Sequence, residues 1–226
     1  MIKEIKELEA RGAWTGVLRS SVPKGVKIVP MTWAFKIKRL PNGKFDKFKA
    51  RICVRGDLQE IDTTIYAPVV KWTTIRAVLA FAVKHQLKTR HVDFANPFIQ
   101  GVLKEEDKVF VQVPQGFGYK AEDAVLPLNR SVYGMRNSPI YWFNTVKATM
   151  TSKAVGCIQS KEDQCMFYHP ELKAIVLLYV DDCLIFAHDD EAINKIIKGL
   201  KSKHDLDEQE MARDVYAFLG IEVNLS

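Results

Sequence analysis

The sequence predicts an α+β fold, in which strands and helices are mixed along the chain without a regular βαβ repeat. Residues 32–55 alternate apolar and charged side chains as a β-hairpin does. Residues 73–86 and 189–200 instead space their apolar residues as amphipathic helices do. With 226 residues, 47% of them hydrophobic, the chain is long enough to bury the core of one large domain or two small ones.

The first elements are a short helix over residues 3–10 and a β-hairpin over Thr32–Arg55 that turns at Leu40-Pro41-Asn42-Gly43. Asn-Gly is typical of tight turns because both residues adopt positive φ angles easily. One face of the hairpin is apolar, and the other carries six cations: Lys36, Lys38, Lys47, Lys49, Arg51 and Arg55. Two interpretations stay open, a surface that binds a polyanion and a solvated face whose lysines discourage edge pairing.

Positive charge is concentrated in this part of the chain. Between Lys24 and Arg55, ten Lys or Arg residues stand against one acid, Asp46, so the segment carries +9 while the whole chain carries +6. A concentrated basic segment is the pattern expected of a surface that contacts phosphates.

The middle of the chain predicts a helix from Thr73 or Thr74 to about Gln86. Strands are expected over residues 91–94 and 109–113, the second of them ending at Pro114. Ser138-Pro139 has the residue types of a helix start, so a further helix is expected from there to about Ser152.

Towards the C-terminus, strands are expected over Ala174–Val180 and Cys183–Ala187, on either side of Asp181-Asp182. A last amphipathic helix begins near Asp189-Asp190. Its apolar face consists of Ile193, Ile196, Ile197 and Leu200. Residues 215–223 are expected to form a final strand.

The sequence shows no signal for export or membrane insertion. Its longest apolar run, residues 174–180, is too short to span a bilayer, and the N-terminus is charged. The four cysteines lack Cys-x-x-Cys or zinc spacing and are interpreted as free thiols. We therefore expect a soluble intracellular, cytoplasmic protein without a membrane partner.

The main chemical candidate is Asp181-Asp182, which is expected to form a β-turn between two apolar strands. An acidic hairpin tip is one interpretation, because aspartate is a common turn residue. A magnesium site is the other, because Mg²⁺ binds one or two carboxylates together with substrate phosphates and would relieve the repulsion between the two charges.

Asp93 is a third carboxylate, placed where a short apolar strand meets a loop. It is interpreted either as a cap for a helix beginning near Asn96 or as a partner of Asp181 and Asp182. Three carboxylates at one end of a sheet can hold two metals about 3.5–4 Å apart, as enzymes of phosphoryl transfer do.

An ordered series of motifs resembles the reverse transcriptase domain of Ty1/copia-type retrotransposons from about Glu4 onward. The series is Trp33-Ala34-Phe35-Lys36, Phe48-Lys49-Ala50-Arg51, Ala67-Pro68-Val69-Val70, Thr73-Thr74-Ile75-Arg76, Val92-Asp93-Phe94 with Phe98 and Gly101, Pro114-Gln115-Gly116-Phe117, Tyr133-Gly134-Met135-Arg136, Ser138-Pro139, Tyr179-Val180-Asp181-Asp182 and Phe218-Leu219-Gly220-Ile221-Glu222. Such a domain is an RNA-directed DNA polymerase.

The resemblance implies the fingers and palm of a right-hand polymerase, with a ferredoxin-like palm sheet packed on helices. Residues 1–226 would form one domain, about 1–90 mainly fingers and about 91–226 mainly palm, with the thumb absent. The partners implied are an RNA template, a DNA or RNA primer and deoxynucleoside triphosphates. The remaining polyprotein segments, RNase H and integrase, are further expected partners, in a virus-like particle where the element is active.

The same resemblance assigns roles to single residues. Asp93, Asp181 and Asp182 would be catalytic and would bind two Mg²⁺ ions, for which Mn²⁺ is an alternative. The nucleotide would be held by Lys49, Arg51, the backbone of Phe94, the sugar-gate ring of Phe98, and Gly134. The strand around Leu219 and Gly220 would hold the primer end.

The sequence departs from the family pattern at several places. Pro97 replaces a small residue before Phe98, and Asn137, Ile140 and Tyr141 replace the more common Gln, Arg and Ala. The stretch from Gln59 to Tyr66 is shorter than usual. A truncated, inactive remnant that at most binds nucleic acid is therefore the alternative function. A third possibility, a ferredoxin-like binding domain unrelated to polymerases, expects Asp93 to lie far from Asp181.

Overall fold

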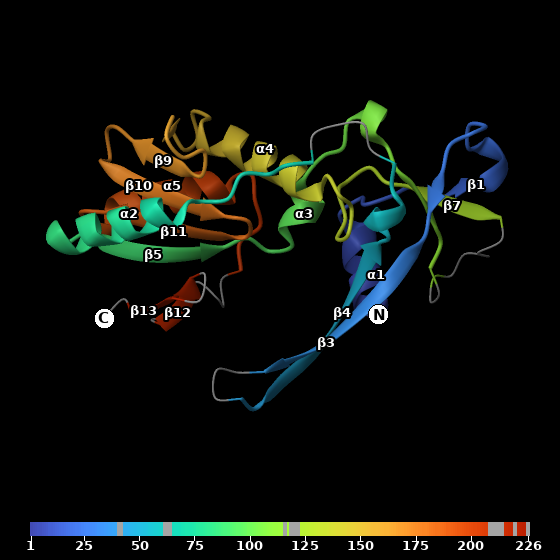
Figure 1. Cartoon of the computed structure of the whole chain (residues 1–226), viewed down its shortest axis with the longest axis horizontal. Helices are drawn as coiled ribbons and strands as arrows, with labels where there is room; N and C mark the ends of the chain where they lie inside the picture. Colours follow the sequence, from blue (N-terminus) through green and yellow to red (C-terminus); the bar gives the residue numbers. More distant parts are fainter. Residues whose placement is uncertain are drawn as a thin grey trace. The chain divides into compact units, whose positions relative to one another are not determined.

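The chain divides into two compact units, each made of two segments (Figure 1). The computed structural model describes residues 1–39, 43–60, 65–114, 117, 123–207, 215–218 and 221–224. Unit 1 comprises Met1–Tyr66 and Phe98–Trp142, and unit 2 comprises Ala67–Pro97 and Phe143–Ser226. The mixture of helices and mostly antiparallel strands confirms the α+β class.

Unit 1 contains a small sheet and a long hairpin. Its elements are α1 (Ile2–Ala10), β1 (Val17–Leu18), β2 (Ile28–Val29), β3 (Met31–Arg39), β4 (Phe45–Val54), β6 (Phe110–Gln112) and β7 (Ala124–Pro127). The sheet has the order β1-β7-β6-β2, in which only the β2–β6 pair is parallel. Helix α3 (Pro97–Gln100) begins at the last residue of unit 2, and the first residues of α4 (Ser138–Met150) complete unit 1.

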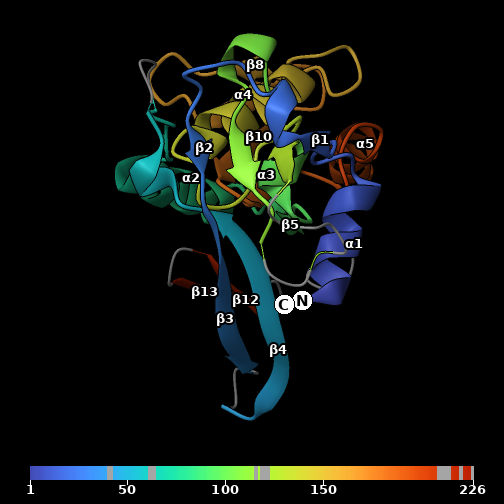
Figure 2. The ribbon, with the colours of Figure 1, turned by 90° about the vertical axis from the view of Figure 1, so that its right-hand side faces the viewer.

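The long hairpin pairs β3 with β4 (Figure 2), and its register puts the expected residues on each face. Lys36 lies opposite Lys49, and Lys38 lies opposite Lys47, so these four cations share one face. The opposite face is apolar and largely exposed, with 68% of Phe35 and 79% of Phe48 accessible. Residues 40–42 of the expected turn lie outside the described residues, and Gly43 has the positive φ of +79° expected there.

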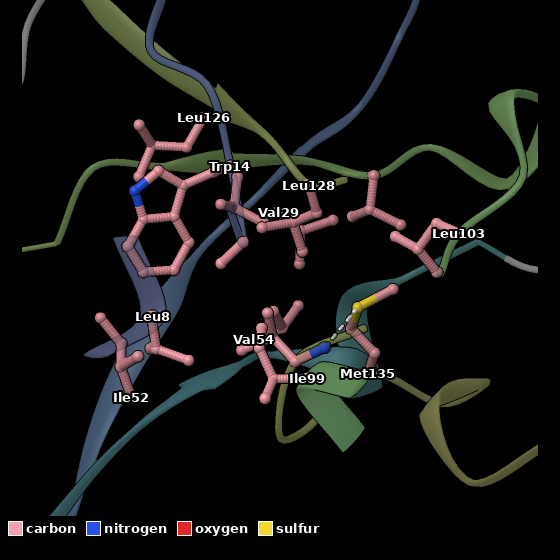
Figure 3. Packing of buried hydrophobic residues seen from close by; sticks show 14 of the residues in the cluster. Leu8, Trp14, Val29, Ile52, Val54, Ile99, Leu103, Leu126, Leu128 and Met135 are labelled. Carbon is pink, nitrogen blue, oxygen red and sulfur yellow. Dashed lines mark hydrogen bonds between the residues drawn. The ribbon is translucent and has the colours of Figure 1, made fainter. Parts of the chain in front are cut away.

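The core of unit 1 joins the N-terminal helix, the base of the hairpin and the small sheet (Figure 3). Leu8 of α1 and Ile52 of β4 lie in the same buried cluster as Trp14. Leu126 and Leu128, within and directly after β7, are fully buried in this cluster too. Burial of each such side chain contributes about 1.5–3 kcal/mol, which fixes the base of β4 against the rest of the unit.

Unit 2 is built on a five-stranded antiparallel sheet with the order β5-β11-β10-β9-β8. These strands are β5 (Lys88–Asp93), β8 (Ile158–Gln159), β9 (Met166–His169), β10 (Ala174–Tyr179) and β11 (Asp182–Ala187). Helices α2 (Trp72–Lys84) and α5 (Asp190–Lys201) and most of α4 complete the unit. The expected C-terminal strand is instead a hairpin of β12 (Val215–Phe218) and β13 (Ile221–Asn224).

Helix α5 begins and packs as predicted. The Asp189 carboxylate accepts a hydrogen bond from the N–H of Ala192 at 2.8 Å, which caps the first turn. The four apolar residues of the predicted face are all buried, and the helix contacts β5 and β11. Helix α4 starts at Ser138, but the Ser138 hydroxyl donates to the carbonyl of Val132 at 2.7 Å and does not cap the helix.

A buried carboxylate joins the start of α2 to the loop before β9. Asp163 Oδ2 accepts hydrogen bonds from the Lys71 N–H at 2.9 Å and the Thr74 hydroxyl at 2.7 Å. Its Oδ1 accepts from the Cys165 N–H at 2.9 Å. These charge-assisted bonds replace the water that the buried carboxylate has lost.

Two expectations concern the chain as a whole. All four cysteines are free thiols, as predicted. Within the part of the chain that the structure describes, no helix is long and apolar enough to cross a membrane.

Candidate active site

The hairpin that carries the acidic pair is shifted by one residue from the prediction. The turn consists of Val180 and Asp181, while Asp182 is the first residue of β11 and pairs with Tyr179. Val180 has a φ of +52°, a conformation that β-branched residues rarely adopt. Strain of this kind costs on the order of 1–3 kcal/mol and is concentrated at functional sites.

Strand β5 brings Asp93 next to this turn. Asp93 is its last residue and lies opposite Asp182 in the antiparallel register, so the two side chains share one face. The N–H of Phe94 donates to the carbonyl of Asp181 at 2.8 Å, which extends the pairing into the turn. Three carboxylates from two distant parts of the sequence therefore meet at one end of the sheet, which contradicts the expectation of an unrelated binding domain.

The surroundings of Asp93 raise its pKa. Burial, and then the negative charges of Asp182, Asp181 and Asp207, raise the pKa of Asp93 to about 7. Asp207 follows α5, and its N–H donates to the Asp93 carbonyl at 2.8 Å. No local sequence pattern indicates Asp207, because only the fold brings it beside a residue more than a hundred positions earlier.

A histidine also joins the cluster. Nε2 of His91 lies 2.8 Å from Oδ1 of Asp182, and the His91 side chain is only 7% exposed. His91 and Asp93 are two positions apart on β5, so they share a face of the sheet. In the sequence His91 is only the first position of the predicted strand 91–94, and no local pattern gives it a role.

The cluster has the donor chemistry of a site for a hard divalent cation. Across the described ranges, no three His, Cys, Asp or Glu side chains are close enough together to enclose an ion by themselves. Mg²⁺ does not need such a cage, because it binds one or two carboxylates and completes its shell with water and substrate phosphates. A cation between Asp93 and the aspartates beside it would remove the repulsion that raises the pKa of Asp93, so the residues fit the ion.

The raised pKa of Asp93 predicts an unusual pH dependence of stability for the metal-free chain. Between about pH 4 and pH 7 the folded state holds a proton on Asp93 that the unfolded state has released. The free energy of unfolding therefore falls as the pH rises through this window. In Asp93→Asn this fall in the free energy of unfolding should be about 1–2 kcal/mol smaller than in the original chain, after allowance for solvent screening.

Urea denaturation of both proteins at pH 5 and pH 8 measures this difference. Comparison with the variant cancels the contributions of the other titrating groups. Parallel pH profiles for the two proteins would show that Asp93 has no raised pKa.

The predicted nucleotide-binding residues form a second cluster, within unit 1. The guanidinium carbon of Arg51 lies 4.5 Å from the centre of the Tyr133 ring. The Phe98 ring meets the same Tyr133 edge-on, with 5.2 Å between the ring centres. Tyr133 therefore links Arg51 and Phe98. The sequence does not reveal these contacts, because Tyr133 lies far along the chain from both residues.

Gly134, the residue after Tyr133, lies directly against β4. The Tyr133 carbonyl accepts a hydrogen bond from the Val54 N–H at 2.8 Å, and Gly134 has a φ of +87°. A side-chain carbon at Gly134 would overlap the carbonyl oxygen of Val54. Glycine is therefore required both by the backbone conformation and by the close approach of β4.

Lys49 stands on the cationic face two residues before Arg51. Burial, and then the charges of Arg51 and Lys38, lower the pKa of Lys49. Glu4 of α1 acts in the opposite direction and raises it. Within the part of the chain that the structure describes, the buried Nε of Arg51 has no hydrogen-bond partner. This part of the hairpin thus combines cationic charge with an unused donor.

The remaining predicted positions are distributed as follows. Leu219 and Gly220 lie outside the described residues, so their expected role in primer binding stays a prediction. Pro97 is the first residue of α3, where a fixed φ suits a helix start. Asn137 is 3% exposed, and its Oδ1 has no hydrogen-bond partner among the residues that the structure describes. The Tyr141 hydroxyl donates to the Asp107 carboxylate.

Comparison with known proteins identifies the family of the chain. The profile of one protein family, reverse transcriptase (RNA-dependent DNA polymerase), matches residues 14–226. The retrovirus-related Pol polyprotein from transposon TNT 1-94 of Nicotiana tabacum is 30% identical over 99% of this chain. The corresponding polyprotein from transposon RE2 of Arabidopsis thaliana is 32% identical over 88% of it.

A more distant relative is the transposon Ty1-ER2 Gag-Pol polyprotein of Saccharomyces cerevisiae, 28% identical over 77% of the chain. The matched regions cover 17%, 14% and 10% of the tobacco, Arabidopsis and yeast polyproteins. The chain thus corresponds to a small part of each relative, and the resemblance inferred from the motifs is confirmed.

Proposed function

Because the chain belongs to the reverse transcriptase (RNA-dependent DNA polymerase) family, we propose that it adds deoxynucleotides to a primer 3′-end as an RNA template directs. The observation that carries the proposal is the pairing of Asp93 with Asp182 beside Asp181 at one end of the unit 2 sheet. A bound cation would relieve the repulsion among these carboxylates that raises the pKa of Asp93.

In this proposal Asp93 and Asp181 are the main ligands of two Mg²⁺ ions, Asp182 completes the carboxylate set, and the Phe94 carbonyl adds a ligand. Mn²⁺ is the alternative ion. When bound, the ions stabilise the charge that develops on the attacking and leaving oxygens during in-line phosphoryl transfer. The chain contributes a fixed anionic end of the sheet, because the register of β5 with β11 sets the positions of Asp93 and Asp182.

Lys49 and Arg51 bind the triphosphate of the incoming nucleotide in this proposal. The support is the net positive charge of their strand face and the unused donor of Arg51. Phe98, held edge-on against Tyr133, excludes a ribose 2′-hydroxyl and thereby selects deoxynucleotides. Gly134 lets the backbone approach the new base pair closely.

Substitution of Arg51 tests the triphosphate assignment. Arg51→Ala is expected to raise the KM for deoxynucleotide by about 10–100-fold, which corresponds to the 1.5–3 kcal/mol of a hydrogen bond to a charged group. Arg51→Lys keeps the charge but loses the planar fork, so an intermediate KM is expected. Steady-state incorporation at varied deoxynucleotide concentration measures both, and Lys104→Ala, which removes an exposed cation of unit 1 outside the hairpin, is the matched control. An unchanged KM in Arg51→Ala would exclude the assignment.

The proposed macromolecular partners are an RNA template and a DNA or RNA primer. The cationic face of the hairpin supplies phosphate contacts, and the exposed rings of Phe35 and Phe48 offer a surface on which unpaired bases stack. The strand around Leu219 and Gly220 holds the primer end. RNase H and integrase segments of the same polyprotein are further proposed partners, in the cytoplasm within a virus-like particle.

Primer extension by the purified chain on a homopolymer RNA template is the test. Incorporation of labelled deoxynucleotide that requires a divalent cation and the matching template is the expected result. Salt-dependent binding of primer–template without any incorporation would indicate the rival function, an inactive remnant that only binds nucleic acid.

A further inference from the structure

We propose that His91 is a positioning residue that holds the Asp182 carboxylate in the orientation in which it binds a divalent cation. This inference rests on the proposed function. Its basis is the 2.8 Å contact between His91 Nε2 and Asp182 Oδ1. The proposal concerns a residue that does not itself touch the nucleotide or the ion.

The fold fixes where the imidazole can lie. His91 pairs with Leu184, and Asp93 pairs with Asp182, so His91 is a diagonal neighbour of Asp182 on the same sheet face. Diagonal neighbours are about 7–8 Å apart, within the reach of a ring side chain. The imidazole therefore reaches along the face of the sheet to the carboxylate, while the directly opposite position holds Asp93.

Burial restricts this contact to one geometry. The His91 side chain is 7% exposed and the Asp182 side chain 28%. Val92 within β5 and Phe94 directly after it are 0% and 1% exposed, so the chain is anchored on both sides of Asp93. The imidazole is the more buried partner of the pair, and in this proposal it sets the orientation of the carboxylate.

The chemistry of the bond determines what is left for the ion. A carboxylate only accepts hydrogen bonds, so Nε2 carries the proton and donates it to Oδ1 of Asp182. In this proposal the second oxygen of Asp182 remains available to the ion. Outer hydrogen bonds that orient a ligand typically change metal affinity by about 10–100-fold when they are removed.

A purely structural histidine is the competing explanation. On that view His91 contributes only packing on the face of the sheet, and its bond to Asp182 satisfies the buried Nε2 of the imidazole. Loss of the imidazole would then lower the free energy of unfolding without changing the affinity of the folded chain for metal. The two explanations differ in metal binding, which can be measured without any polymerase activity.

The experiment compares two variants of the full 226-residue chain that differ in one donor group. His91→Gln can place an amide N–H close to the position of Nε2, whereas His91→Phe fills the site with a ring that cannot donate. Binding of Mn²⁺ is followed from the electron paramagnetic resonance signal of the free ion, and urea denaturation of each variant reports its stability. Asp182→Asn shows how much of the affinity depends on this carboxylate.

His91→Phe is expected to raise the Kd for Mn²⁺ by about 10–100-fold, while His91→Gln stays within about threefold of the original chain. The inference is overturned if His91→Phe binds Mn²⁺ as tightly as the original chain, or if His91→Gln is as weak as His91→Phe. If the Phe variant does not fold, His91→Asn replaces it, since its amide is one methylene too short. Equal affinities of the Gln and Asn variants would then overturn the inference.

Failure of the proposed function gives a different result. If the original chain binds no Mn²⁺, the carboxylate cluster is not a metal site, and both the function and this inference fall. If it binds Mn²⁺ with an affinity that Asp182→Asn leaves unchanged, the function stands and this inference falls. If the original chain binds Mn²⁺ through Asp182 but His91→Phe does so equally well, the function stands and only the role of His91 is wrong.

Discussion

Replacement of Asp181 by Asn is expected to lower the rate of primer extension at least about 10³-fold, because loss of one preorganised group that acts on developing charge already costs about 10²–10³-fold. Asn has nearly the same size as Asp and tolerates the turn position that Asp181 occupies. The variant therefore removes a negative charge from the proposed metal site while it keeps the turn between β10 and β11. Single-turnover incorporation of one nucleotide, at saturating template and Mg²⁺, measures the effect.

Glu171→Gln is the matched control, since it also neutralises an exposed acid of unit 2, on the turn before β10. It should leave the rate of incorporation unchanged. Far-ultraviolet circular dichroism and urea denaturation verify that both variants are folded. Incorporation by Asp181→Asn at the rate of the original chain would exclude Asp181 as a metal ligand.

Replacement of Gly134 by Ala is expected to destabilise the chain by about 3 kcal/mol or more, through two effects. A residue with a side chain is strained at a φ of +87°. The added carbon would also overlap the carbonyl oxygen of Val54, and β4 is held there by the hydrogen bond from Val54 to Tyr133. Equilibrium denaturation in urea measures the loss, and the KM for deoxynucleotide should rise in variants that still fold.

Gly25→Ala separates the two effects. Gly25 has a similar φ of +85°, but a carbon added there meets nothing within 4 Å. It should therefore cost only the conformational strain, about 1–2 kcal/mol. Equal destabilisation by Gly25→Ala and Gly134→Ala would show that the contact between Gly134 and β4 contributes nothing.

The elements that the sequence predicted well are those with long, uninterrupted periodicity. The β3–β4 hairpin alternates from Trp33 to Lys38 and from Lys47 to Val54, and its lysines share one face as predicted. The pairing is irregular between Lys38 and Arg39, where the alternation ends. Helix α5 has both a capping aspartate and a regular apolar face, so its start and its packing followed from the sequence. In both cases local propensity and burial favour the same structure.

Short elements and turns were predicted less well. Strands β1, β2 and β8 have two residues each, too few to show any periodicity. The turn between β10 and β11 was expected at Asp181-Asp182, since two acids are better turn residues than Val180. The structure places Val180 in the turn with a strained φ because the pairing of Tyr179 with Asp182 extends β11 by one residue.

The candidate site was only partly visible in the sequence. Asp93, Asp181 and Asp182 stand beside apolar strands, so their convergence could be expected before the sheet was known. His91 and Asp207 join them through the register of β5 and through the segment after α5, which depend on the fold of unit 2. Tyr133 likewise contacts Arg51 and Phe98 only because its carbonyl is bonded to β4.

The most direct test of the central claim is an anomalous difference map from crystals of the chain grown with primer–template, an unreactive deoxynucleotide analogue and Mn²⁺. The account predicts two peaks about 3.5–4 Å apart, each bound by carboxylate oxygens of Asp93 or Asp181, with Asp182 beside them. Peaks elsewhere in the molecule, together with carboxylates of Asp93 and Asp181 that bind no ion, would contradict it.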